Sequence, residues 1–113
     1  MLGAGLCLAT PAWAVDSGTV DRFVRLSARF HAQLPNSDVT GLSGAAQRTR
    51  AVCILSRFES AFGSGGVQAL MNLMSVLSQG AEFDDPTIIA FNDRFGSAYD
   101  RTERDCTRAA LSS

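Results

Sequence analysis

Apolar residues recur at steps of three and four along most of this chain, and no stretch shows a sustained alternation of apolar and polar residues. A repeat near 3.6 residues predicts amphipathic helices, whereas half-buried strands would need a repeat of two. Four such segments are predicted, at about residues 17–34, 43–62, 67–79 and from 86 onward. With 113 residues, 46% of them hydrophobic, the chain has room for one ordinary domain and its core. We therefore expect an all-α fold of about four helices, in a small bundle or orthogonal array.

Turn-forming residues separate the four segments. Pro35 cannot continue the first helix, and the three residues after it are turn formers. A glycine-rich run at residues 63–66 divides the second segment from the third, and Gly80 is placed to cap the third at its C-terminus. Asp85 followed by Pro86 predicts an N-cap with proline at the first helical position. The connections between the predicted helices are therefore short.

The first fourteen residues form an uncharged and largely apolar block. Residues 2–9 have the length of a signal-peptide hydrophobic region, and Ala-Trp-Ala at 12–14 supplies small residues at the positions that signal peptidase reads. We expect a cleaved signal peptide at residues 1–14 and a single helical domain at 15–113, periplasmic or secreted. The block is shorter than the ~20 apolar residues of a membrane span, so no integral span is expected in the mature chain.

Two other interpretations of the N-terminal block stay open. The first is a lipid anchor on Cys7, although Leu6 is larger than the residue that usually precedes a lipidated cysteine. The second is a buried N-terminal helix of a cytoplasmic protein. A secretory signal normally opens with Lys or Arg, and here none precedes Arg22.

Removal of the signal would leave two cysteines, Cys53 and Cys106. An even number of cysteines in a small exported domain predicts a disulfide, so we expect these two to pair. Neither belongs to a CxxC motif and the chain has one histidine, so a thiolate metal site or a dithiol redox centre lacks its other parts. Two inert buried thiols are the remaining alternative. Cys53 lies on a stripe of small residues, which predicts a close approach of the helix that bears Cys106 and a central place for the second segment.

The charges exclude one class of partner. Ten basic and eleven acidic residues give a formal net charge of −1, which leaves no positive excess to hold a phosphate backbone. We therefore expect no nucleic-acid partner.

Four features could carry chemistry, and each is better explained by structure. His31 is the only histidine and falls near the middle of an apolar stripe, as a hydrogen-bonded core residue would. Met71 and Met74 have a spacing that could hold Cu(I), but methionine commonly fills helical cores. The glycine run at 63–66 resembles a phosphate-binding loop, but no lysine follows it. The acids at 82, 84 and 85 lack the ligand spacing of a calcium-binding loop and suit the N-terminus of a helix. We expect no metal and no cofactor.

The third segment, residues 67–79, contains no charged side chain, which is unusual for a surface helix. Such a helix is either deeply buried or presents an apolar face to something else. Leu73 and Val76 lie off its core stripe, so we expect them in an exposed contact patch, with Met71 and Met74 as further candidate binding residues.

These observations predict a non-catalytic exported protein that binds a protein partner or a hydrophobic ligand, or that associates with itself. As a small exported helical domain with one long-range disulfide, it resembles periplasmic acid-stress chaperones in design, though in no motif. That resemblance implies a bundle that acid loosens, exposing Phe and Met side chains. A second alternative is a small hydrolase, which would need a concave site that joins His31 to an acid and a hydroxyl.

Overall fold

The computed structural model describes residues 15–112. Among the described residues the elements follow in the order α2 (Ser17–His31), the short 3-10 helix η2 (Asp38–Gly41), α3 (Gly44–Ser78) and α4 (Pro86–Leu111). No strand occurs within residues 15–112, so the all-α prediction is confirmed there. The predicted signal peptide lies outside the described residues.

The helices begin at the caps that their sequences supply. Asp16 accepts the N–H of Thr19 at 2.7 Å, and Ser43 accepts that of Ala46 at 3.0 Å. Asp85 accepts the N–H of Thr87 at 2.8 Å, as expected for an aspartate placed before Pro86. These bonds satisfy amide groups that have no partner inside the helix.

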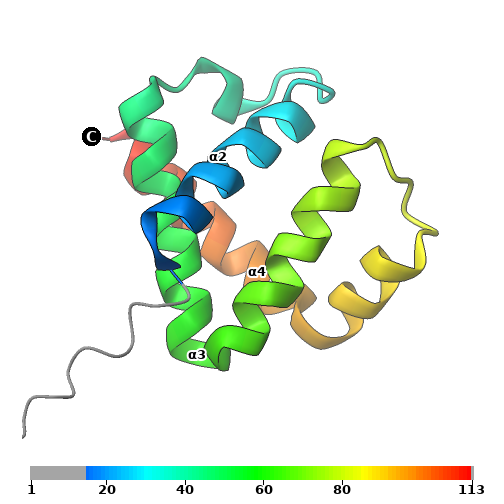
Figure 1. The fold of residues 1–113 in the computed structure, drawn as a ribbon. Coiled ribbons are helices and arrows are strands. Elements are labelled where there is room, and N and C mark those ends of the chain that lie inside the picture. The colour runs from blue at the N-terminus through cyan, green and yellow to red at the C-terminus, as the bar shows by residue number, and fades with distance from the viewer. Residues whose placement is uncertain (1–14, 113) are drawn as a thin grey trace, which may run out of the picture.

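The predicted count of about four helices is slightly too high, because the second and third segments form one element, α3. Gly63 alone departs from helical geometry inside it, with φ 73° and ψ −169°. Glycine reaches this conformation without the steric cost of a Cβ atom, so α3 bends there and residues 64–66 already belong to its second arm. Figure 1 shows the two arms of α3 as a V.

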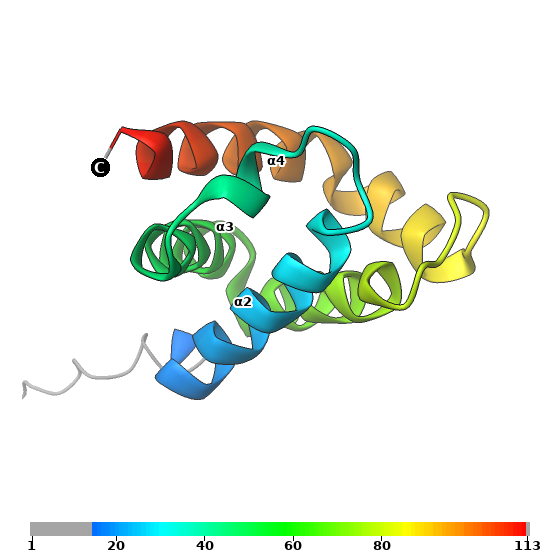
Figure 2. The same ribbon diagram turned by 90° about the horizontal axis from the view of Figure 1, so that it is seen from above.

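The bent helix α3 is the element against which both others pack. Seen from above in Figure 2, its first arm lies between α2 and α4. The fully buried core side chains come from all three helices, and Phe58 stands at the centre of an aromatic cluster with Phe91, Phe95 and Tyr99. The first arm of α3, which contains the second predicted segment, is therefore the central helix, as the sequence predicts.

The predicted disulfide is present. Cys53, on the first arm of α3, bonds to Cys106 on α4, with their Cα atoms 5.7 Å apart. Because 53 positions separate the two cysteines, the crosslink ties the middle of the chain to its last helix.

A buried arginine joins the three helices. Arg50 on α3 is 1% exposed and donates to Thr107 at 2.7 Å, to Ser27 at 3.0 Å and to Glu103 at 3.1 Å. Thr107 in turn donates to Glu103 at 3.1 Å. Every partner of the guanidinium is thus a side chain of α2 or α4, and its charge is balanced by one carboxylate.

Candidate functional site

An apolar recess of about 500 Å³ lies where α2 and α3 end. Residues 81–84, in the connection between α3 and α4, complete its lining. Figure 1 shows this connection at the edge of the molecule, between the end of α3 and the start of α4. The lining side chains come from these three places: Phe30, Gln33, Leu34, Leu77, Ala81, Glu82, Phe83 and Asp84. We call this cavity the Phe83 recess.

Phe83 is the most exposed large apolar side chain of the described residues, at 86%. It occupies the second position of a tight turn that is closed by the N–H of Asp85 and the carbonyl of Glu82, 2.9 Å apart. Such a turn directs its central side chains outward. The aromatic ring is therefore presented to solvent by ordered backbone.

The chain on the other side of Phe83 is equally well defined. Gly80, with φ 86°, ends α3 in a Schellman motif, in which the N–H of Ala81 bonds to the carbonyl of Val76 at 3.1 Å. The N–H of Gly80 bonds to the carbonyl of Leu77 at 3.0 Å. This confirms the predicted C-terminal cap at Gly80.

Gln33 fastens the end of α2 to the end of α3. Its side-chain amide donates to the carbonyls of Ser78 at 3.1 Å and Leu77 at 3.5 Å, and to the carbonyl of Arg29 in α2 at 3.3 Å. The bond to Ser78 also engages a carbonyl at the end of α3, where carbonyl groups lack the next helical turn. The two walls of the Phe83 recess are thus held together before any ligand arrives.

The charged side chains that line the Phe83 recess are both acidic. Glu82 and Asp84 flank Phe83 in sequence and are exposed. Within residues 15–112 the ion pairs join Asp21 to Arg48, Glu103 to Arg50 and Asp105 to Arg57, and none involves Glu82 or Asp84. Both carboxylates are therefore free at the rim.

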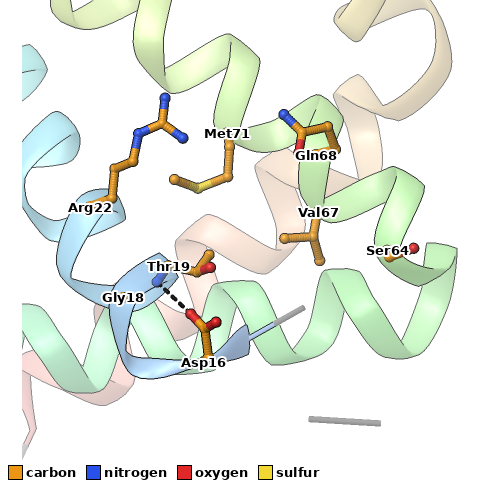
Figure 3. A pocket seen from close by; sticks show the side chains of 8 residues that line it. All are labelled: Asp16, Gly18, Thr19, Arg22, Ser64, Val67, Gln68 and Met71. Atoms are coloured by element: carbon orange, nitrogen blue, oxygen red, sulfur yellow. Dashed lines mark hydrogen bonds between the residues drawn. The ribbon is translucent and has the colours of Figure 1, made fainter. Parts of the chain in front are cut away.

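A second cavity, of about 460 Å³, lies between the first turns of α2 and the second arm of α3 (Figure 3). The carboxylate of Asp16 is already engaged there, because it accepts the N–H of Thr19, and this bond lowers the pKa of that carboxyl. Arg22 supplies one cation, and the buried Val67 and Met71 form an apolar wall. None of the lining residues is a large exposed apolar side chain, so this cavity offers little apolar surface to a ligand.

A third cavity, of about 350 Å³, is lined by His31, Ser37 and Glu103 among other residues. His31 Nδ1 lies 2.7 Å from Ser37 Oγ. Burial of the ring, with a smaller effect from the positive charge of Arg50, lowers the pKa of His31 to about 4, against an opposing effect of Glu103. The imidazole is therefore neutral at pH 7.

The His31 cavity brings together the histidine, hydroxyl and acid that the hydrolase alternative requires. Two observations speak against a catalytic use. A general base is most effective when its pKa is near the working pH, and a pKa of about 4 makes His31 a weak base. The Ser37 hydroxyl is also engaged, since it accepts the N–H of Val39 at 3.2 Å and so caps η2.

The four candidate binding residues of the third segment lie in or against the core. Leu73 is 4% exposed, Met71 3% and Met74 0%, while Val76 is half-buried. The expectation that Leu73 and Val76 form an exposed patch is therefore wrong, because α2 and α4 flank this arm of α3 from two sides. A binding role for these residues stays a prediction, and it would require the arm to leave the core.

Phe83 and Arg50 were not singled out from the sequence, although each carries a recognisable signal. Phe83 is an aromatic residue between two acids in a short connection, and it belongs to none of the apolar stripes that predict the core. Arg50 stands four residues before Ile54 and eight before Phe58, on the same stripe of a helix as these core residues. A charged residue on a core stripe predicts a buried, paired charge.

No protein-family model, curated protein or solved structure matches this chain. Across residues 15–112, no group of three His, Cys, Asp or Glu side chains is placed to hold a metal ion. The described helices include none with the length and apolar character of a membrane span.

Proposed function

We propose that this protein is an exported, non-catalytic helical module that binds an apolar ligand or partner segment in the Phe83 recess. The observation that carries the proposal is the 86% exposure of Phe83 beside a cavity of about 500 Å³ with apolar walls. A large exposed aromatic side chain next to a preformed recess is typical of binding sites.

The exposed apolar side chains of the Phe83 recess supply part of the free energy that binding requires. Covering a fully exposed Phe side chain is worth about 1.5 to 3 kcal/mol, and Leu34, 40% exposed at the opposite wall, adds a smaller amount. Buried aromatic anchors of this kind account for much of the affinity of protein interfaces. The ordered turn and the Gln33 bonds lower the entropic cost of binding, because the walls need no rearrangement.

The disulfide supports the exported part of the proposal, since crosslinks of this kind persist in oxidising compartments. Expression of the whole chain in a bacterial host tests it. Intact mass of the periplasmic protein is expected to show a chain that begins at Val15. Retention of residues 1–14 on the recovered protein would contradict the proposed export route.

Binding is tested with the neutral dye Nile red and the variant Phe83→Ser. We expect the substitution to weaken dye binding about tenfold or more, because the anchor is worth more than ~1.4 kcal/mol. Ile89→Ser is the matched control, since Ile89 is an exposed apolar side chain on α4, 48% exposed, and does not line the recess. Both substitutions should leave the stability within about 0.5 kcal/mol. Equal dye affinity in the two variants would overturn the proposed site.

A second candidate function, acid-triggered chaperone activity, is favoured by the position of His31 beside Arg50. Protonation of the imidazole in acid adds a positive charge next to a buried guanidinium. If the bundle loosens as a result, Met71, Leu73 and Met74 become available to unfolded proteins. Binding of the dye ANS at pH 3 but not at pH 7, with suppressed aggregation of a denatured reporter at pH 3, is the expected result. An unchanged near-UV spectrum at pH 3 without dye binding would exclude it.

A further inference from the structure

We propose that the natural occupant of the Phe83 recess is an amphipathic segment of a protein partner that carries Lys or Arg beside its apolar anchor. This inference rests on the proposed binding function and adds the chemistry of the partner.

The rim acids, Glu82 and Asp84, form no ion pair among the described residues. Asp85 already caps α4, accepting the N–H of Thr87 at 2.8 Å, so the start of that helix does not need Glu82 or Asp84. Neither of these two side chains has an ion pair or a hydrogen bond within residues 15–112. Both flank the aromatic anchor directly, so a segment that covers Phe83 must pass close to two free carboxylates.

The backbone adds to the negative potential. Both α2 and α3 end at the recess, after His31 and Ser78. The C-terminal end of a helix carries a partial negative charge, so the ends of α2 and α3 add to the negative potential near the two carboxylates, and Arg29 in the last turn of α2 offsets part of it. The positive end of α4 also lies nearby, and the carboxylate of Asp85 sits directly on it. A cationic group on the partner is therefore complementary to the rim, and an acidic group is repelled.

The size of the recess favours a peptide segment with a small apolar face. A volume of about 500 Å³ accommodates a few side chains, as in grooves that receive one face of an amphipathic helix. A second copy of this chain is a rival occupant, because α4 ends with Leu111, 55% exposed, close to Arg108. In that case the end of α4 in one copy would fill the recess of the next copy. Because the two surfaces differ, such a contact produces a closed ring or an open filament.

The test uses the mature protein and three synthetic amphipathic helical peptides that share one apolar face of Leu and Phe. Their polar faces carry Lys, Gln or Glu, and dissociation constants are measured by calorimetry at low salt. The wild type should bind the Lys peptide about fivefold more tightly than the Gln peptide, since two exposed ion pairs contribute modestly, and the Glu peptide most weakly. The preference should nearly vanish at high salt because exposed charges are screened.

The double variant Glu82→Gln/Asp84→Asn should reduce the Lys preference to less than about twofold. Asp93→Asn/Asp100→Asn is the matched control, because it removes the same charge from two exposed positions of α4 outside the recess. Its preference should stay at the wild-type value. Equal loss of preference in the two double variants would attribute the effect to net charge and overturn the inference.

The remaining outcomes separate this inference from the proposed function. If the wild type binds all three peptides equally, and Phe83→Ser abolishes that binding, the recess is a binding site but the basic partner is wrong. If no peptide binds while Nile red binds at Phe83, the recess takes a small ligand and the inference also fails. An oligomer on size-exclusion chromatography that Phe83→Ser dissolves would assign the recess to a second copy. Failure of Phe83→Ser to affect either dye or peptide would remove the proposed function itself.

Discussion

His31 should make the stability of this protein decrease as the pH falls from 6.5 to 4. The side chain is 8% exposed, and its pKa is lowered from 6.5 to about 4 by burial and, to a smaller extent, by Arg50. The charged groups around it come from three elements: Arg50 on α3, Asp38 on η2, and Glu103, Arg104 and Arg108 on α4.

The sign of the effect follows from the two pKa values. The unfolded chain takes up the proton near pH 6.5, whereas the folded chain takes it up only near pH 4, so acid favours the unfolded state between these values. At about 1.4 kcal/mol per pKa unit the full effect is roughly 3 to 4 kcal/mol, and it levels off below about pH 3, where the folded-state imidazole is also protonated. We expect a loss of about 1 kcal/mol at pH 5.5 and about 2 to 3 kcal/mol at pH 4.5, relative to pH 7.5.

Urea denaturation of the wild type and of His31→Asn, followed by circular dichroism from pH 7.5 to 4.5, measures this contribution. Asn can keep a hydrogen bond to Ser37 but does not titrate, so carboxylate titration is common to both proteins and the difference between their pH slopes reports His31. This histidine is the only one in the chain, which makes the assignment unambiguous. The reasoning would be refuted if the two proteins lost the same unfolding free energy between pH 7.5 and 4.5, within about 0.5 kcal/mol. An NMR titration of His31 centred near pH 6.5 would refute it as well.

The other predictions concern the crosslink, the buried charge and the core. Cys53→Ser should cost roughly 4 kcal/mol on the chain-entropy account and lower the melting temperature by more than ~8 °C, and free thiols in the freshly purified native protein would contradict this. Arg50→Ala should cost about 3 to 5 kcal/mol in urea denaturation, because it opens a cavity in the core and leaves the buried hydroxyls of Ser27 and Thr107 without their donor, whereas Arg57→Ala, at an exposed pair, should cost less than about 1 kcal/mol. Similar values for the two would show that Arg50 is not buried as described. Leu73→Glu should destabilise the fold by several kcal/mol, since it places an unpaired charge in the core, and a wild-type melting temperature would restore the contact-patch interpretation.

Local chemistry explains why much of the fold could be predicted. The helix starts at Asp85 and Pro86 and the end at Gly80 depend on hydrogen bonds and dihedral angles within a few residues, and both are found as expected. The disulfide could be predicted from the number of cysteines and from the small residues around Cys53, which allow a close helix. In these cases the deciding interaction lies within a few residues or follows from simple counting.

The errors have one physical origin. A glycine-rich run predicts a break, but whether the flanking helices separate or continue through a bend depends on what they pack against, and here Gly63 alone turns α3 back on itself. The burial of Leu73 likewise depends on two helices that lie far away in sequence.

The sequence by itself determined the helical class, the caps and the pairing of Cys53 with Cys106, because periodicity and local hydrogen bonding act over short distances along the chain. Only the tertiary structure decided that Arg50 is buried among side chains of three helices and that His31 lies beside it. It also decided that Phe83 stands exposed next to the ends of α2 and α3. Such placements arise when helices meet in space, and the repeat of any one helix contains no information about which neighbour will cover it.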